Sequence, residues 1–336
     1  MKLSLGSIVS ESDARSAVTT QLNPGWLDPS SYVAFLNRGF PGEWDRVAYD
    51  WYAARAFNGV HSELLVRAQG SRILSGMTLC YRQIDVDARH PIDVCVLSAG
   101  ATLSTERGRG HYRILLQAAL ERSREKSCAA VLGFVTRDNS SGRGLVRLGA
   151  RSIPSYYIVS ADRPRIRCAS RARALASRPN SNFHQWSALD SVLALSARSR
   201  VDLSGPSSGQ QARFHYEHVE DWEGQFIHRP HAVRAIHLAH DSLALVESVR
   251  ATDRLQWLAC PDGKTARCIA ALATASAVAG RDFFMYTLDP HQAAVARRVG
   301  LRIRAGYLMV LPTGHSNGSW DRLANAVWRV QSGDRL

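Results

Sequence analysis

Apolar and polar positions in the first half of the chain alternate between two periods. Runs rich in β-branched residues predict strands, whereas apolar residues spaced three and four positions apart predict helices. In chain order they predict a helix, three strands, a helix, a strand, a short helix and a closing strand. These elements cover residues 49–57, 62–69, 73–84, 92–104, 111–126, 129–136, 139–150 and 154–161. The alternation of strands and helices predicts an α/β domain.

The second half repeats this order of elements. After a predicted helix and a glycine- and serine-rich insertion it predicts a hairpin, a strand, a helix, a strand, a helix and a final strand. In that order, the helix, the insertion and the later elements cover residues 183–199, 204–211, 232–249, 254–260, 264–280, 282–288, 290–300 and 302–312. Both halves end in a strand, a short helix with a late glycine, and another strand. We therefore predict an internal duplication: a domain of residues 1–162, an arginine-rich linker of residues 163–180 and a second domain of residues 181–336.

The composition fits a protein with two buried cores. A chain of 336 residues is long enough for both, and no run approaches the ~20 apolar residues of a membrane span. Serine and acidic residues arrive early in the first 16 positions, so a secretory signal peptide is not expected. The six cysteines include no CxxC pair, which indicates reduced thiols and a cytoplasmic protein.

The formal net charge of +13 raises the question of a nucleic-acid partner. Nearly all of the basic residues are arginines, and they are spread along the whole chain. The densest run, residues 162–179, has no aromatic side chain on which a base would stack. We therefore expect neither nucleic acid nor a membrane as the main partner, and local phosphate sites instead. The sequence leaves the oligomeric state open.

Residues 105–112 form a cationic glycine loop between a predicted strand and a predicted helix. The first N–H groups of a helix have no intrahelical partner, and the helix dipole adds positive potential at the same end. Glycine lets the backbone approach an oxyanion closely, and Arg107 and Arg109 add charge. The loop therefore predicts an anion site. It lacks the third glycine of the dinucleotide fingerprint, and the Gly-Lys-Thr at 263–265 lacks the earlier glycine of a P-loop.

In context the loop resembles the pyrophosphate loop of the GCN5-related N-acetyltransferase (GNAT) family. The family signature is Arg/Gln-x-x-Gly-x-Gly/Ala, and residues 107–112, Arg-Gly-Arg-Gly-His-Tyr, occupy its six positions. Residues 131–151 resemble the fifth strand, the asparagine and the fourth helix that follow. The second half is similar only in element order and in its ending at 295–301. The resemblance implies two GNAT-like domains in tandem, each a mixed, mostly antiparallel sheet flanked by helices.

The resemblance implies acetyl-CoA or another acyl-CoA as co-substrate. The loop amides would bind the CoA pyrophosphate, and the end of strand 92–104 would splay from strand 129–136 to hold the pantetheine arm. An amide near Leu103 would polarise the thioester carbonyl. The implied cofactor-binding residues are Ala101, Thr102, Leu103, Arg107, Gly108, Arg109, Gly110, His111, Tyr112 and Asn139.

Two positions in the first half depart from the family pattern. Tyr112 stands where the signature has Gly or Ala, and we expect it to pack under the helix. The family often carries a tyrosine on the fourth helix as general acid, where this chain has Leu145 or Val146. Another acid or solvent would then protonate the CoA thiolate.

The second half lacks the phosphate loop altogether. Residues 261–268, Pro-Asp-Gly-Lys-Thr-Ala-Arg-Cys, carry one glycine and no Arg-Gly-x-Gly. We predict that this half binds no CoA, supports the first half and forms part of the acceptor pocket.

Acyl transfer to an amine needs a group that takes up the amine proton. The strand end before the loop carries no carboxylate, so the candidate bases are Asp93, Glu106 and His111. Asp93 and Glu106 could equally be surface charges, and His111 a solvent-facing residue or a phosphate contact. Tyr156 is a candidate acid on the closing strand. Asp138 is expected to cap the short helix that follows it.

Six of the twelve histidines fall within residues 215–240. Such density could indicate a zinc or iron site. The segment is predicted to span a helix, a turn at Pro230 and a hairpin, so the pairs point in different directions and we predict no metal. We predict instead that the segment lines the acceptor cleft between the halves; the alternative is a solvated amphipathic helix. The candidate substrate-binding residues are His215, Glu217, His218, Trp222 and His228.

Together these features predict an acyl-CoA-dependent N-acyltransferase that acts by direct transfer on a small amine metabolite or natural-product intermediate. O-acylation is an alternative. A non-catalytic acyl-CoA-binding protein is another, because the helix tyrosine and the strand carboxylate are missing. An arginine-driven nucleic-acid binder is the third.

Overall fold

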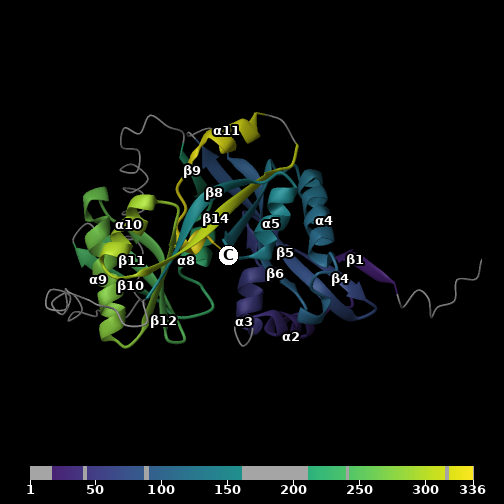
Figure 1. The fold of residues 1–336 in the computed structure, drawn as a ribbon, viewed down its shortest axis with the longest axis horizontal. Coiled ribbons are helices and arrows are strands. Elements are labelled where there is room, and N and C mark those ends of the chain that lie inside the picture. Colours follow the sequence, from purple (N-terminus) through teal and green to yellow (C-terminus); the bar gives the residue numbers. More distant parts are fainter. Residues whose placement is uncertain are drawn as a thin grey trace, which may run out of the picture.

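The computed structural model describes residues 17–40, 44–86, 91–160, 211–239, 242–314 and 318–335. The strands join into one 13-stranded mixed sheet that runs through both halves. Eleven of them follow in the order β1-β4-β5-β6-β7-β14-β8-β13-β12-β11-β10; of the other two, β9 pairs with β5 and β15 pairs with β9. Figure 1 shows the first half, in purple to teal, beside the second half, in green to yellow. The predicted α/β class with a mixed sheet is confirmed.

The first half contributes β1 (Val18–Leu22), β4 (Glu63–Gln69), β5 (Arg72–Val86), β6 (Ile92–Thr102), β7 (Ala130–Thr136) and β8 (Arg151–Val159). Its helices are α2 (Pro29–Gly39), α3 (Arg46–Tyr49), α4 (His111–Glu125) and α5 (Ser140–Arg147). Leu115 and Leu116 of α4 and Leu145 of α5 are buried in one core with side chains of β5 and β7. β6 and β7 are parallel, whereas β1, β4, β5 and β6 pair antiparallel.

The second half contributes β9 (Gln211–His215), β10 (Val233–Ala239), β11 (Ser242–Val249), β12 (Thr252–Ala259), β13 (Asp282–Thr287), β14 (Arg302–Pro312) and β15 (Val327–Trp328). Its helices are α8 (Val219–Phe226), α9 (Thr265–Val278), α10 (Pro290–Arg298) and α11 (Ser319–Asn325). Three antiparallel strands are followed by a parallel one, as in the first half. The predicted repeat of element order is therefore present in the fold.

The two halves exchange strands at the centre of the sheet. β14, from the second half, lies between β7 and β8 of the first half and pairs antiparallel with both. β8 in turn pairs antiparallel with β13 of the second half. Each half thus completes its part of the sheet with a strand from the other.

Most predicted elements are present to within a few residues at each end. The prediction of one helix over 49–57 is wrong in part: a π-helix (Asp50–Ala54) continues α3, and the chain then forms a hairpin of β2 (Ala56–Phe57) and β3 (Val60–His61). Its two-residue turn, Asn58-Gly59, has positive φ at both positions, which is typical of such hairpins. The predicted linker 163–180 and helix 183–199 lie outside the described residues, as does most of the insertion 204–211.

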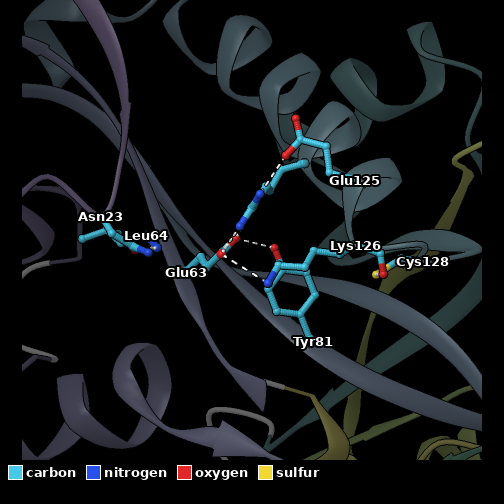
Figure 2. A network of polar contacts seen from close by, with 8 residues as sticks. Asn23, Glu63, Leu64, Tyr81, Glu125, Lys126 and Cys128 are labelled. Carbon is cyan, nitrogen blue, oxygen red and sulfur yellow. Dashed lines mark hydrogen bonds and ion pairs between the residues drawn. The ribbon is translucent and has the colours of Figure 1, made fainter.

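A network of polar contacts on β4 and β5 fixes α4 against the sheet (Figure 2). The Glu63 carboxylate accepts hydrogen bonds from the Tyr81 hydroxyl at 2.6 Å and from the Arg122 guanidinium at 2.7 Å. Arg122 lies in the last turn of α4 and also pairs with Glu125 at 2.7 Å. Its hydrogen bonds hold the pKa of Glu63 below its usual range. The anchored C-terminal end of α4 fixes the direction in which its N-terminus points.

Candidate functional site

β6 and β7 form a slot because they pair over a short stretch and then part. Their parallel register runs from Val94 opposite Ala130 to Leu97 opposite Gly133 and ends there. β7 continues beyond this point and keeps its pairing with β14 as far as Thr136. The predicted splay between the two strands is therefore present.

A β-bulge shapes the β6 side of this slot. Ala99 and Gly100 together face a single residue of β5, Met77. Ala99 has a φ of +48°, in the left-handed region that residues with a Cβ rarely adopt. Bulges and such backbone conformations concentrate at functional sites, where they re-aim backbone groups.

The glycine loop leads from the end of β6 to the first turn of α4. Gly108 has a φ of +81° and Gly110 a φ of +80°, so both positions favour glycine for conformational reasons. A Cβ added at either would meet no atom within 4 Å. Gly110 is the N-cap residue of α4, and no side chain caps the helix. The first N–H groups of α4 therefore face an open loop, which is the geometry of an anion site.

Glu106 holds this loop together from beneath. Its carboxylate is buried and lies 2.9 Å from a guanidinium nitrogen of Arg72, 3.2 Å from one of Arg109, and 3.7 Å from the Nε2 of His111. The charge of Arg109 is therefore partly neutralised by the buried carboxylate of Glu106. Arg107 is exposed and makes no ion pair with any described residue. Both loop arginines are exposed, and Arg107 is the one whose charge no described carboxylate pairs with.

The two bulky residues that start α4 both point inward. His111 is buried, turns its Nε2 toward Glu106, and leaves its Nδ1 without a hydrogen bond within the described residues. Tyr112 packs between α4 and the bulge: its hydroxyl would lie 3.2 Å from a Cβ added at Gly100. Burial raises the pKa of Tyr112 to about 12, and a hydrogen bond with Ser141 opposes the shift. Tyr112 therefore joins the loop, the bulge and the start of α5.

Asn139 begins α5 on the far side of the slot. Its side-chain oxygen accepts hydrogen bonds from the Ser141 N–H at 2.9 Å and the Ser141 hydroxyl at 2.7 Å. Asn139, and not Asp138 as predicted, is the N-cap residue; the helix starts one residue later than the sequence suggests. The Asn139 amide nitrogen is left over for a ligand in the slot.

The slot opens into a cleft of about 900 Å³ between the halves. Leu97, Ala99, Gly100, Tyr112 and Asn139 line it from the slot, Trp44 and Tyr52 from the first helices, and Arg229, His231, Arg254, Gln256, Phe284 and Arg304 from the second half. The walls are held together beside the cleft. The Trp51 indole donates to the Gly224 carbonyl at 2.8 Å, and the Arg229 guanidinium lies 4.2 Å from the centre of the Trp51 ring.

The second half has a corresponding slot between β12 and β13. These strands pair in parallel over three positions, Thr252–Arg254 with Asp282–Phe284, and then part. β12 also carries a bulge, at Gln256, as β6 does at Ala99.

Residues 331–335 fill this second slot. The Tyr286 N–H donates to the Ser332 hydroxyl at 3.0 Å, and the Gln331 side chain bonds both the N–H and the carbonyl of Leu258 at 3.3 Å. Gly333 packs so closely that an added Cβ would lie 2.8 Å from the Phe226 ring. Figure 1 marks this end of the chain at the centre of the molecule, between the halves.

Asp334 lies buried within the filled slot. Its carboxylate accepts hydrogen bonds from the Tyr216 hydroxyl at 2.5 Å and from the Gln331 N–H at 2.7 Å. The Tyr216 hydroxyl accepts one from Arg82 at 2.8 Å. Burial raises the pKa of Asp334 to about 6.

Three of the predicted cofactor-binding residues do not line the slot. Ala101 and Leu103 are buried in the core beneath α2, and the Thr102 hydroxyl lies 2.8 Å from that of Ser75. The Leu103 N–H, predicted to polarise the thioester, donates to the Leu74 carbonyl at 3.0 Å. The prediction is wrong here because β6 leaves β7 several residues earlier than expected, at the bulge.

The predicted acid and bases lie away from the cleft. Asp93 is at the opposite end of β6 from the bulge and accepts a hydrogen bond from Gln83 at 2.9 Å. Tyr156 packs against the core of the second half. Glu106 and His111 face each other beneath the loop. None of the four is among the residues that line the cleft.

The five predicted acceptor-binding residues are also outside the cleft. His215 pairs with Asp85 at 2.9 Å, and Trp222 is buried against Trp257 and Phe226. His228, near Glu223, and Glu217 and His218 are exposed. The same segment does reach the cleft, but through Arg229 and His231. No group of three or more metal-ligating side chains occurs among the described residues.

Solved structures resemble the chain over most of its length. A GCN5-related N-acetyltransferase from Kribbella flavida matches with a TM-score of 0.54 at 15% identity, over 88% of this chain and 71% of that one. The N-myristoyltransferase of Saccharomyces cerevisiae with bound myristoyl-CoA gives 0.58 at 9% identity, over 88% and 83%. A tandem GNAT protein from the clavulanic acid biosynthesis pathway gives 0.51 at 13% identity, over 88% and 99%. No protein-family model and no curated protein matches the sequence.

The fold is therefore that of the GNAT acyltransferases. More particularly, it is the tandem form, with two GNAT-like units in one chain. None of the described helices is long and apolar enough to cross a membrane.

Proposed function

We propose that the protein is an acyl-CoA-dependent acyltransferase that uses acetyl-CoA and transfers the acyl group directly to a small amine. One observation carries the proposal: the slot between β6 and β7 leads from an open cleft to a glycine loop at the N-terminus of α4. A slot suits the extended pantetheine arm, and the loop suits the pyrophosphate. The fold is one shared by acyl-CoA-dependent enzymes.

In this proposal the pyrophosphate lies on the amides that follow Gly108 and Gly110, with Arg107 as the charged contact. The Asn139 amide bonds the pantetheine arm from α5. The thioester reaches the bulge at Ala99, beside Tyr112, where both residues line the cleft. The acceptor amine enters from the second half and attacks the thioester carbonyl, so that both reactants are held in one cavity.

The amine must lose a proton when it attacks the thioester. His231 is the one histidine that lines the cleft among the described residues, and we infer that it accepts this proton. The CoA thiolate then leaves and needs no strong acid, because a thiol is a good leaving group near neutral pH.

A binding experiment tests the proposal directly. Arg107→Glu should weaken acetyl-CoA binding by more than tenfold in calorimetry, because it replaces a charge-assisted phosphate contact with repulsion. Arg298→Glu, an equal charge change on an exposed position of α10, should leave the affinity unaltered. Equal affinity in wild type and Arg107→Glu would remove the loop from the cofactor site.

A non-catalytic acyl-CoA-binding protein is a second candidate. It is favoured because α5 carries Leu145 and Val146 where the resemblance to the GNAT family implies a tyrosine. Release of CoA thiol in the presence of amines separates the two functions. Catalysis predicts steady release that His231→Gln slows at least tenfold while acetyl-CoA affinity is kept. A binding protein gives no release with any amine.

A further inference from the structure

The cleft wall contributed by the second half is strongly cationic. Two of the described residues that line the cleft are acidic, Asp45 and Asp282. Asp45 accepts a hydrogen bond from the Ala48 N–H at 2.7 Å as the cap of α3. Six arginines line the same cleft, all from the second half: Arg229, Arg250, Arg254, Arg302, Arg304 and Arg335.

Strand register places several of these arginines on one face of the sheet. Arg302 lies opposite Val159, Val159 opposite Phe284, and Phe284 opposite Arg254, across β14, β8, β13 and β12. Residues directly opposite one another point to the same face. Arg304 lies two residues along β14 and therefore shares that face. Arg254 and Arg302 thus flank an apolar centre from either side.

Arg335 lies over this centre. Its guanidinium carbon is 4.9 Å from the centre of the Tyr157 ring and 5.0 Å from that of Phe284. A guanidinium that stacks on aromatic faces keeps its N–H edges available for a planar oxyanion. The ring of Tyr157 is in turn seated over Gly306, where an added Cβ would clash with it.

These arginines differ in the partners that they have among the described residues. Arg229 pairs with the buried Glu247 at 3.0 Å. Arg254, Arg304 and Arg335 make no ion pair with any described residue, in a cleft where like charges repel. Several arginines gathered in one cavity with few carboxylates favour an anionic ligand, because each adds a charge-assisted hydrogen bond. The CoA phosphates do not fill this role in the proposed function, since their loop lies at the other end of the slot.

We propose that the acceptor is an amine that also carries an oxyanion, a carboxylate or a phosphate, and that Arg254, Arg304 and Arg335 bind this group. The inference rests on the proposed function, which makes an amine the group that reacts with the thioester. The oxyanion lies on the arginine wall, and the amine points across the cleft toward the bulge of β6. Neutral amines of the same length fit the cavity but lack the anchor.

Matched pairs of amines test the assignment. Protein loaded with CoA, which carries no acyl group and so cannot react, is titrated by calorimetry with 4-aminobutyrate against butylamine, and with O-phosphoethanolamine against ethanolamine. In at least one pair the anionic amine should bind at least tenfold more tightly than its neutral counterpart, and the stronger pair identifies carboxylate or phosphate. Arg254→Gln should reduce that preference at least tenfold, and Arg254→Lys should restore part of it.

Three controls keep the outcomes separate. Arg298→Gln removes the same charge outside the cleft and should retain the full preference. Arg304→Gln, at an exposed position of β14, repeats the test if Arg254→Gln proves unstable. The titration is repeated without CoA. A failure of CoA to bind, which would contradict the proposed function, then still leaves the anion preference measurable. Equal binding of anionic and neutral amines overturns the proposal, and so does a loss of acetyl-CoA affinity in Arg254→Gln with the amine preference retained.

Discussion

The slots of the two halves are built alike, but the first is open and the second is filled by a segment of the chain itself. In each, a strand with a bulge, β6 or β12, pairs in parallel with the next strand for three or four residues and then parts from it. The first slot opens into the cleft and adjoins a loop with two glycines of positive φ. The second holds residues 331–335 and is followed by a turn of Asp262–Lys264, after which no side chain caps α9.

This difference separates what the fold supplies from what a site requires. Both halves have a slot because both repeat the same strand order, with a bulged strand that pairs in parallel with the next strand over a short stretch. A slot that opens into the cleft and an adjoining anion loop are present together in the first half alone among the described residues. We therefore expect one acyl-CoA per chain, and the substitutions below are chosen to close the first slot or to loosen the second.

Closing the first slot should have the largest effect. Leu97→Trp places an indole at the last paired position of β6, where the slot begins, and should weaken acetyl-CoA binding by roughly 100-fold, or ~2.7 kcal/mol. Leu258→Trp in β12 is the matched control and should keep wild-type affinity while lowering the melting temperature, since Leu258 is bonded to Gln331. A folded Leu97→Trp protein with wild-type affinity in calorimetry would show that the pantetheine arm lies elsewhere.

Loosening the second slot should cost stability and leave cofactor binding intact. Gly333→Ala forces a Cβ to within 2.8 Å of the Phe226 ring and 2.9 Å of the Gln256 carbonyl oxygen, which should cost about 1–3 kcal/mol in the free energy of unfolding. Gly263→Ala, where a Cβ meets nothing within 4 Å, is the control for denaturant melts. Titration should still find one acetyl-CoA per chain. A second equivalent site would mean that the loop is dispensable.

A smaller effect should appear in how the stability of the protein depends on pH, through Asp334 in the filled slot. Burial raises the pKa of Asp334 to about 6, above the ~3.9 of an aspartate in an unfolded chain. The folded state therefore binds this proton more tightly, and the carboxyl lowers stability as pH rises through 6. Between pH 5 and 7 the free energy of unfolding of the wild type should fall by about 1 kcal/mol relative to that of Asp334→Asn. Parallel curves for the two proteins in denaturant melts would contradict the buried ionisation, and the exposed Asp138→Asn serves as reference.

The parts of the site that depend on local sequence could be predicted. The loop with Gly108 and Gly110 was identifiable because positive φ is a property of single residues in a short motif. The slot between the two strands was implied by the family resemblance, but the residue at which it begins was not. The bulge at Ala99 carries no composition signal, and it moved the lining upstream of the predicted Ala101 to Leu103.

The acceptor side could not be predicted because it depends on strand register between distant segments. Arg254 and Arg302 share a face only because β8 and β13 lie between their strands, a pairing that no local pattern encodes. In the histidine-rich segment, α8 turns Trp222 and Phe226 into the core, which leaves Glu217 and His218 outside. A high density of reactive residues in the sequence therefore gave no guide to which of them face the cleft.

The exchanged strands also set the order of events during synthesis. β7, which forms one wall of the open slot, is completed at residue 136, but its partner β14 ends at Pro312. Such non-local pairing is slow to form, and the nascent first half carries unpaired strand edges until it does. If the proposed function holds, an acyl-CoA would find a finished site only after β14 has been synthesised. Shorter nascent chains would lack the stabilisation that a bound acyl-CoA would give.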